Sequence, residues 1–170
     1  MSSSTGAGLA RRSVALGGGV RVPYPEPSSD AASRLGKAIR RADSKPEMWL
    51  RSALHRRGLR FRKDHLVRAG KIRVKPDIVF TRARVAVFVD GCFWHSCPQH
   101  GRRPTSNQEY WAAKLDGNVA RDRRVDQALL AEGWVVLRLW EHGLGQDAVD
   151  LIAATVNDQR DKLVPRASAT

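Results

Sequence analysis

Residues 85–100 read Val-Ala-Val-Phe-Val-Asp-Gly-Cys-Phe-Trp-His-Ser-Cys-Pro-Gln-His, and this stretch decides how the rest of the chain is interpreted. Its first part, residues 85–90, is an almost continuous apolar run, which predicts a strand buried on both faces. The second part holds both cysteines, two of the five histidines and a Phe-Trp pair. Thiolates and imidazoles at short spacing are typical metal ligands, and aromatic rings beside basic residues can stack on bases. The stretch is therefore either a metal-stiffened DNA-reading loop or the polar end of a core strand.

The charge of the chain points to a polyanion partner. The 170 residues include 30 Lys plus Arg against 17 Asp plus Glu, a formal net charge of +13. Such an excess favours nucleic acid, because neutralising phosphates releases condensed counterions. A basic surface that serves only solubility, or ribosome association without catalysis, is the plainer alternative. No apolar run approaches a membrane span and the N-terminus lacks a signal-peptide core, so we expect a cytoplasmic protein without a membrane partner.

The composition along the chain predicts one folded domain between two polar ends. Residues 1–32 are rich in Ser, Gly, Arg and Pro, which is typical of a disordered or arm-like basic leader. Residues 33–158 predict a single α/β domain with a mixed central β-sheet flanked by helices. A basic tail is expected over residues 159–170.

Capping and periodicity signals predict the main elements. A helix should begin after Ser44, with Glu47 at the capping-box position, and stop at Gly58. Its apolar face is expected to consist of Met48, Trp49, Ala53 and Leu54. Strands are predicted over residues 59–63, 72–80, 85–90 and 134–140, with a connection at 65–70. Residues 107–132 predict a helix in two pieces interrupted at Gly117, and residues 146–158 predict the last helix. Core positions expected in the 107–132 region are Tyr110, Trp111, Leu115, Val119, Val125, Leu129 and Leu130.

Two carboxylates are expected at one end of the sheet. Asp77 begins one strand and Asp90 ends the next, so a tight turn between these strands would bring their side chains together. Mg²⁺ takes one or two protein carboxylates and keeps several waters. A cation bound there would acidify a water and stabilise charge on a phosphodiester. The alternative is that Asp77 only starts its strand and Asp90 only caps the other.

The chain also offers four nitrogen and sulfur ligands that suit tetrahedral zinc. They are Cys92, Cys97, His100 and His142. A closed set of four implies a structural ion, because a catalytic zinc keeps one position open. Two small buried thiols with a surface histidine are the alternative, and His95 could replace one of the ligands.

His95 could move protons near a phosphate if a carboxylate fixed its tautomer, and Asp122 is a candidate for that carboxylate. Asn118 and Asp122 lie one helical turn apart and project from the same face. A solvated, charged helix face is the alternative. Phe93 and Trp94 are either core side chains at a strand end or rings that stack on or wedge between bases.

Several motifs in consistent order resemble the very-short-patch repair endonucleases. They are Ser44-Lys45-Pro46-Glu47, Pro76-Asp77, the string 88–95, Asn118 with Arg121-Asp122, and residues 133–142. The string Gly-Cys-Phe-Trp-His is the most specific of them. The resemblance implies a restriction-endonuclease-like core with a structural zinc. It also implies a monomeric, Mg²⁺-dependent hydrolase that nicks duplex DNA 5′ to the thymine of a T·G mismatch, the product of 5-methylcytosine deamination.

The resemblance further implies a role for each candidate residue. Asp77 and the backbone carbonyl of Val89 would bind Mg²⁺, and Glu47 would orient waters around the cation. His95 would be the general acid/base, supported by Asp122. Phe93 and Trp94 would wedge beside the mismatch, while the DNA would also be contacted by Asn118, Arg121 and an arm at Lys37. Zinc would be held by Cys92, Cys97, His100 and His142.

This chain departs from the best-known member at two places. That member has a histidine where this chain has Asp90, and a threonine where it has Val89. A carboxylate at position 90 could bind metal but could not transfer protons as an imidazole does, so His95 is the expected proton carrier and Asp90 a further catalytic candidate. Cysteine and histidine are also exchanged among the zinc ligands.

The sequence leaves two other functions open. One is a zinc-stabilised DNA-binding module that does not cleave, and the other is a restriction or defence nuclease with its own sequence preference. Other mismatch-repair proteins are expected as helper partners, in a bacterial cytoplasm close to the nucleoid.

Overall fold

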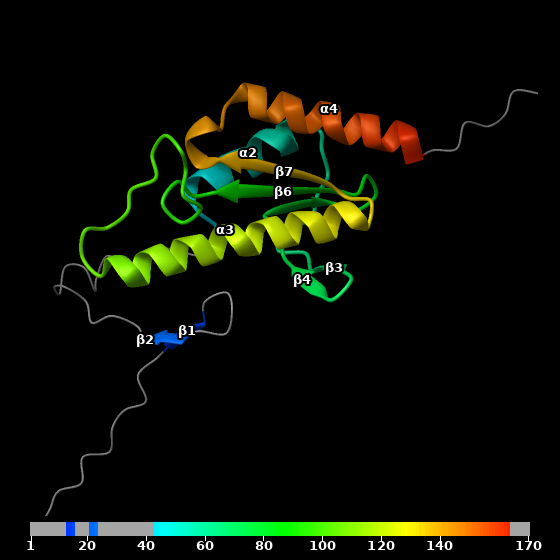
Figure 1. Ribbon diagram of the computed structural model, residues 1–170. Coiled ribbons are helices and arrows are strands. Elements are labelled where there is room, and N and C mark those ends of the chain that lie inside the picture. The colour runs from blue at the N-terminus through cyan, green and yellow to red at the C-terminus, as the bar shows by residue number, and fades with distance from the viewer. Residues whose placement is uncertain (1–12, 16–20, 24–42, 164–170) are drawn as a thin grey trace, which may run out of the picture.

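A computed structural model of the chain describes residues 13–15, 21–23 and 43–163. Its centre is a three-stranded sheet in the order β5–β6–β7, formed by Ile78–Phe80, Val85–Asp90 and Val135–Trp140. β5 pairs antiparallel with β6, and β6 pairs parallel with β7, so the sheet is mixed as predicted. Because β6 and β7 run in the same direction, the loops that follow them leave at the same edge of the sheet (Figure 1). That edge holds the candidate site.

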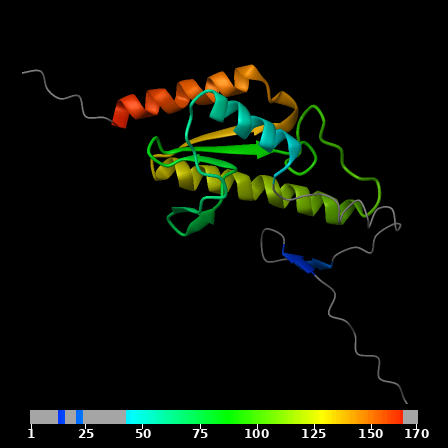
Figure 2. The same ribbon diagram turned by 180° about the vertical axis from the view of Figure 1, so that it is seen from behind.

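Helices cover both faces of this sheet, as Figures 1 and 2 show. On one face, α2 (Lys45–Arg56) and α4 (Gln146–Leu163) enclose a core that includes Val85 and Val87. On the other face, α3 (Gln108–Ala131) and the β3–β4 hairpin (Val67–Ala69 and Ile72–Val74) enclose a core that includes Ala86 and Phe88. Successive side chains of a strand point to opposite faces, so a strand covered on both sides must be apolar throughout. This explains the continuous apolar run of residues 85–89.

The start and the end of α2 were predicted correctly, and its buried face was predicted in part, at Ala53 and Leu54. Ser44 is the N-cap and accepts a hydrogen bond from the Glu47 backbone N–H at 3.4 Å, and Gly58 ends the helix region with φ +79°. The core face consists of Leu50, Ala53 and Leu54, which follow the i, i+3, i+4 spacing of one helix face. The prediction of Met48 and Trp49 as core residues was wrong, since they are 48% and 41% exposed.

α3 is one continuous helix, which corrects the prediction of a break at Gly117. A glycine in a helix interior costs about 1 kcal/mol relative to alanine. Leu115 and Val125 are buried on the two sides of Gly117, and their packing outweighs this cost. The burial of Tyr110, Leu115, Val125 and Leu129 was predicted, whereas Leu130 is 58% exposed and Trp111 and Val119 are half-buried.

The strand predictions needed four corrections. Residues 59–63 form only an isolated bridge, between Arg62 and Val79. The expected connection 65–70 contains β3, and the expected strand 72–80 is divided into β4 and β5 by residues 75–77. β7 is half-buried along its length, because it is an edge strand of its sheet.

The two predicted chain ends also differ in part. α4 continues to Leu163, past the predicted end of the domain at residue 158. Within the predicted leader, β1 (Ser13–Ala15) pairs antiparallel with β2 (Arg21–Pro23), a pairing that the sequence did not predict. The rest of the leader and the arm at Lys37 lie outside the described residues. Among the helices of the described ranges, none is both long enough and apolar enough to span a membrane.

Candidate active site and metal centre

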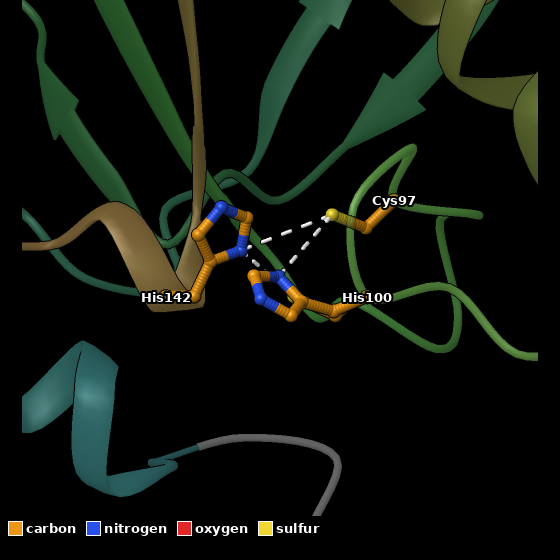
Figure 3. Close-up of side chains that lie close together, drawn as sticks. Cys97, His100 and His142 are labelled. Carbon is orange, nitrogen blue, oxygen red and sulfur yellow. Dashed lines mark hydrogen bonds between the residues drawn. The ribbon is translucent and has the colours of Figure 1, made fainter.

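Two loops that follow parallel strands bring the four Cys and His side chains together. Cys92 and Cys97 lie in the loop after β6, with His100 three residues further on, and His142 lies in the 3-10 turn η1 (Glu141–Gly143) after β7. Figure 3 shows the side chains of Cys97, His100 and His142 turned toward one another. One ligand atom from each of the four residues lies within 4.8 Å of all the others. The clustering predicted from the spacing is therefore confirmed.

The donor set fits a zinc ion in chemistry, and two of its three sulfur–nitrogen separations are close to those of a zinc site, while the third is shorter. Cys92 Sγ lies 3.0 Å from His142 Nδ1, and Cys97 Sγ lies 3.8 Å from the same nitrogen and 3.9 Å from His100 Nδ1. Zn–S and Zn–N bonds at tetrahedral angles separate such atoms by about 3.4–3.8 Å. Both thiols are buried and both histidines are exposed. An ion bound by all four would therefore link the buried side of the β6 loop to the exposed histidines. His95 lies outside this cluster and does not compete for a ligand position.

Backbone contacts hold the loop in the shape that the cluster requires. The Cys97 N–H donates to the Cys92 carbonyl at 2.9 Å, and the Gly101 N–H donates to the Cys97 carbonyl at 2.7 Å. A Cβ at Gly101 would lie 2.9 Å from the Cys97 nitrogen, closer than real side chains come, so this position needs glycine. Glu141 completes the frame, because its Oε1 accepts the Cys92 N–H at 2.8 Å and so ties the β6 loop to the β7 loop.

The same β6 loop presents His95 to helix α3. His95 Nδ1 lies 2.6 Å from Asp122 Oδ2 and 3.6 Å from Asp90 Oδ1. Asn118, one turn before Asp122, donates from Nδ2 to the Trp94 carbonyl at 3.0 Å. The face of α3 that carries Asn118 and Asp122 therefore contacts the β6 loop. This agrees with the prediction that both side chains project from one side of the helix. With Nδ1 on a carboxylate, Nε2 is the nitrogen left to meet a substrate.

Burial alone would raise the pKa of Asp122, but the hydrogen bond with His95 and the charge of Arg138 hold it below its usual value. Asp122 is therefore ionised at neutral pH, and its carboxylate accepts a hydrogen bond from the N–H at Nδ1 of His95. A carboxylate in this position fixes the imidazole tautomer and stabilises the imidazolium.

Asp90 has a partner that the sequence did not predict. Asp90 is only 6% exposed, and its Oδ1 and Oδ2 accept hydrogen bonds from Arg138 Nη1 at 2.8 and 3.0 Å. The sequence suggested that Asp90 could face a cation beside Asp77, and instead an arginine of the neighbouring strand neutralises it. Arg138 is the one charged residue in β7, and that isolated charge in an apolar strand was the available signal.

Asp77 lies just before β5, where its Oδ2 accepts the Val89 N–H at 2.8 Å. The pKa of Asp77 is raised from 3.8 to about 6, mainly by burial; the Val89 hydrogen bond opposes this rise, and the charges of Glu47 and Asp90 add to it. A carboxylate that is costly to ionise beside other carboxylates is favourable for a divalent cation. The oxygen-rich surroundings therefore fit Mg²⁺, for which Asp77 would be the protein's direct ligand.

Glu47 serves the helix start, and its charge helps to raise the pKa of Asp77. Its Oε1 accepts the Ser44 hydroxyl at 2.7 Å and its Oε2 accepts the Asp43 N–H at 3.0 Å, so the capping box closes one residue earlier than predicted. Arg51 pairs with Asp43 and lies 3.9 Å from Glu47. The carboxylate is thus held at the N-terminus of α2, where the helix dipole favours negative charge.

An aromatic cluster lies next to His95. The ring centroids of Phe93 and Trp94 are 5.0 Å apart, and Trp111 of α3 lies 5.4 Å from Phe93 and 6.1 Å from Trp94. All three rings are half-buried, which leaves edges available for contact. Trp111 was missed as a site residue, because its helical spacing suggested the core. Arg121, near the middle of α3, is exposed, and its Nη2 lies 3.6 Å from Asp122 Oδ1.

The structure is a mixed α/β fold in which a buried acid, a carboxylate-bound histidine and a cluster of Cys and His side chains lie at one end of the central sheet.

Comparison with known proteins gives the family. The family described as DNA mismatch endonuclease Vsr matches residues 29–100. The type II nicking enzyme V.NaeI of Lentzea aerocolonigenes is 56% identical over 135 residues, which cover 79% of this chain and 81% of that protein. The type II nicking enzyme V.XorIIP of Xanthomonas oryzae pv. oryzae is 42% identical over 111 residues, 63% and 76% of the two chains. The DNA mismatch endonuclease Vsr of Escherichia coli (strain K12) is 37% identical over 113 residues, 66% and 70%. The chain belongs to the Vsr family of DNA endonucleases, which confirms the resemblance that its sequence motifs indicated.

Proposed function

We propose that this endonuclease nicks duplex DNA on the 5′ side of the thymine in a T·G mismatch, by Mg²⁺-dependent hydrolysis. The observation that carries the proposal is that Asp90 connects Asp77, the candidate cation ligand, with His95, the candidate proton carrier. Its carboxylate raises the pKa of Asp77 on one side and lies 3.6 Å from His95 on the other. A cation ligand and a proton carrier would thus act on one phosphodiester, beside the aromatic rings of the same loop. The names of the relatives, mismatch endonuclease and nicking enzymes, support the same reaction.

Asp77 and the backbone carbonyl of Val89 would hold the Mg²⁺, and Glu47 would orient waters around it. Bound there, Mg²⁺ would supply positive charge to the scissile phosphate and lower the pKa of a water. The Val89 N–H fixes one oxygen of Asp77, which leaves the other free for the cation. Hydrolysis would leave a 5′-phosphate and a 3′-hydroxyl.

His95 would move the proton, through the Nε2 atom that its contact with Asp122 leaves free. Asp90 would help to hold the ring instead of binding the metal, because Arg138 already occupies its carboxylate. Zinc held by the Cys and His cluster would stiffen the loop that carries His95, so its role is structural.

Replacing His95 with Gln should lower the single-turnover nicking rate about 10²- to 10⁴-fold, the range for a lost general acid/base, with binding of a T·G duplex unchanged. Asp122→Asn should give a smaller loss, because the ring remains but its tautomer is no longer fixed. Asp116→Asn is the matched control, since Asp116 is a carboxylate of the same helix whose one ion pair among the described residues is with the exposed Arg103. Wild-type rates in His95→Gln would contradict the assignment.

Phe93 and Trp94 would wedge into the base stack beside the mismatch. Asn118 would set the direction of the wedge, because it holds the Trp94 carbonyl. Arg121 would contact a phosphate, as would Lys37, for which the described residues give no geometry. The net charge of +13 supports a duplex DNA partner, and the protein would act on the DNA of the cytoplasm.

Trp94→Ala should weaken binding to a T·G duplex about 5- to 100-fold, because base–aromatic stacking contributes about 1–3 kcal/mol per base. Trp94→Phe keeps a ring and should lose only a few-fold. Fluorescence anisotropy with labelled duplexes measures both. If Trp94→Ala lowered the melting temperature and left the affinity of the folded protein unchanged, Trp94 would be a core residue instead.

Mapping the nick on end-labelled duplexes tests the proposed reaction. The proposal requires a single cut, next to the mismatched thymine, with 5′-phosphate and 3′-hydroxyl ends. A panel of other mismatches in varied contexts separates a restriction or defence nuclease, which would follow the sequence and ignore the mismatch. Binding without any cut would favour a non-cleaving module. Whether helper mismatch-repair proteins raise the rate can be measured in the same assay.

A further inference from the structure

Arg138 lies between the sheet and α3, where three carboxylates meet its guanidinium. On β6, Asp90 accepts two contacts from Nη1 at 2.8 and 3.0 Å. On α3, Asp126 accepts from Nε, with both oxygens at 3.0 Å, and Asp122 Oδ1 lies 3.3 Å from Nη2. The guanidinium carbon also lies 4.6 Å from the centroid of the Phe88 ring. Each nitrogen of the planar fork therefore has its own partner, and an aromatic face holds the plane.

Both carboxylates that touch His95 are held by this one guanidinium. Asp122 uses Oδ1 for Arg138 and Oδ2 for His95 Nδ1. Asp90 uses Oδ1 for both, at 2.8 Å from Arg138 Nη1 and 3.6 Å from the imidazole. Arg138, a residue of β7, therefore fixes the positions of the Asp90 and Asp122 carboxylates relative to the imidazole ring of His95. The guanidinium also offsets negative charge beside a site for a phosphate, where two uncompensated carboxylates would repel the substrate.

We propose that Arg138 is a positioning residue for the reaction, which aligns Asp90 and Asp122 so that His95 presents Nε2 to the DNA. The inference rests on the proposed role of His95. Lysine would keep the charge but could not reproduce the three-way fork, because its ammonium is a point charge. The geometry of the guanidinium, and not only its charge, is what the reaction needs.

Three variants test this inference: Arg138→Gln, Arg138→Lys and, as the matched control, Asp126→Asn. Asp126 binds Arg138 without touching His95, so its loss leaves the two acceptors of the imidazole in place. In single-turnover nicking of a T·G duplex, Arg138→Gln should slow the rate about 10- to 100-fold, the range for lost supporting contacts. Arg138→Lys should recover only part of this loss, and Asp126→Asn should stay within a few-fold of the wild type. The affinity for the duplex should change little in Arg138→Lys and Asp126→Asn, and it should fall in Arg138→Gln, which no longer offsets the charges of Asp90 and Asp122.

A purely structural role would give a different result. It would lower the melting temperature and the amplitude of the single-turnover phase, but the rate constant of the folded fraction would stay at the wild-type value. That outcome, measured below the melting temperature of each variant, overturns the proposal. So does full recovery by Arg138→Lys.

A double variant tests whether Arg138 acts on His95 through Asp122. If Arg138 acts by way of Asp122 and His95, Arg138→Gln combined with Asp122→Asn should be no slower than the slower single variant. Multiplied effects would contradict this. In ¹⁵N spectra, His95 should carry its proton on Nδ1 in the wild type and give mixed tautomers in Arg138→Gln. An unchanged tautomer in Arg138→Gln contradicts the inference. If His95→Gln were itself fully active, the proposed function would fail, and that result is separate from any effect of Arg138.

Discussion

Cys97→Ala should lose a bound zinc ion and unfold about 10 °C or more below the wild-type protein, because a structural metal contributes several kcal/mol to folding. The loop from Cys92 to Gly101 has few backbone hydrogen bonds of its own, and its two thiols point inward toward His142. Without a cation that joins the thiols to His142, these groups would contribute little to the free energy of folding. Metal analysis should find one zinc per wild-type chain, and differential scanning calorimetry measures the loss.

A chelator provides the control for this prediction. A strong zinc chelator should lower the melting temperature of the wild type toward that of Cys97→Ala, and should leave the variant unchanged. Nicking should be lost with the metal, because His95 lies in the same loop. A wild-type protein that contains no zinc and melts at the same temperature with chelator would refute a structural metal centre.

Asp77→Asn should abolish nicking, by about 10³-fold or more, and should make the protein more stable at neutral pH. The activity is lost because the carboxylate ligand of the proposed Mg²⁺ is gone. The stability rises because the pKa of Asp77 is raised from 3.8 to about 6 in the folded protein, so ionising it costs free energy. An amide avoids that cost and can still accept the Val89 N–H. The gain should be about 1–3 kcal/mol.

The pH dependence follows from the sign of this shift. Below about pH 4 the carboxyl is protonated in both folded and unfolded chains, so wild type and Asp77→Asn should differ little. As the pH rises toward about 6, the unfolded chain ionises and the folded one resists, so the wild type loses stability relative to the variant. Above pH 6 the difference should stay constant, and Mg²⁺ should reduce it. Urea unfolding at pH 4 and pH 7 measures this, and an Asp77→Asn protein less stable than the wild type at pH 7 would contradict it.

The parts of the site that are local in sequence were predictable. A short Cys and His spacing inside one loop, or Asn118 and Asp122 one turn apart, can be read from the chain, because loop and helix geometry relate near neighbours. His142 was also predictable as the fourth ligand, because a closed tetrahedral site needs a donor beyond Cys92, Cys97 and His100. The sheet register that brings them together had to come from the structure.

The parts that depend on packing between elements were not predictable. Arg138 is next to Asp90 because β7 lies parallel to β6, and next to Asp122 because α3 covers that face. The isolated charge in β7 signals that Arg138 needs a partner, but it does not identify Asp90 or Asp122 as that partner. Periodicity also could not choose between Leu50 and Trp49 as the core residue, because the helix rotation is set by what α2 packs against.

The most direct measurement compares nicking of two duplexes that differ at one base, T·G and T·A, by the wild-type endonuclease with Mg²⁺ and with EDTA. The account predicts a cut beside the thymine of the T·G duplex in Mg²⁺ alone, and a much lower rate on the T·A duplex. Equal rates on the two duplexes would contradict mismatch specificity. Cutting that persists in EDTA would contradict the role assigned to Asp77.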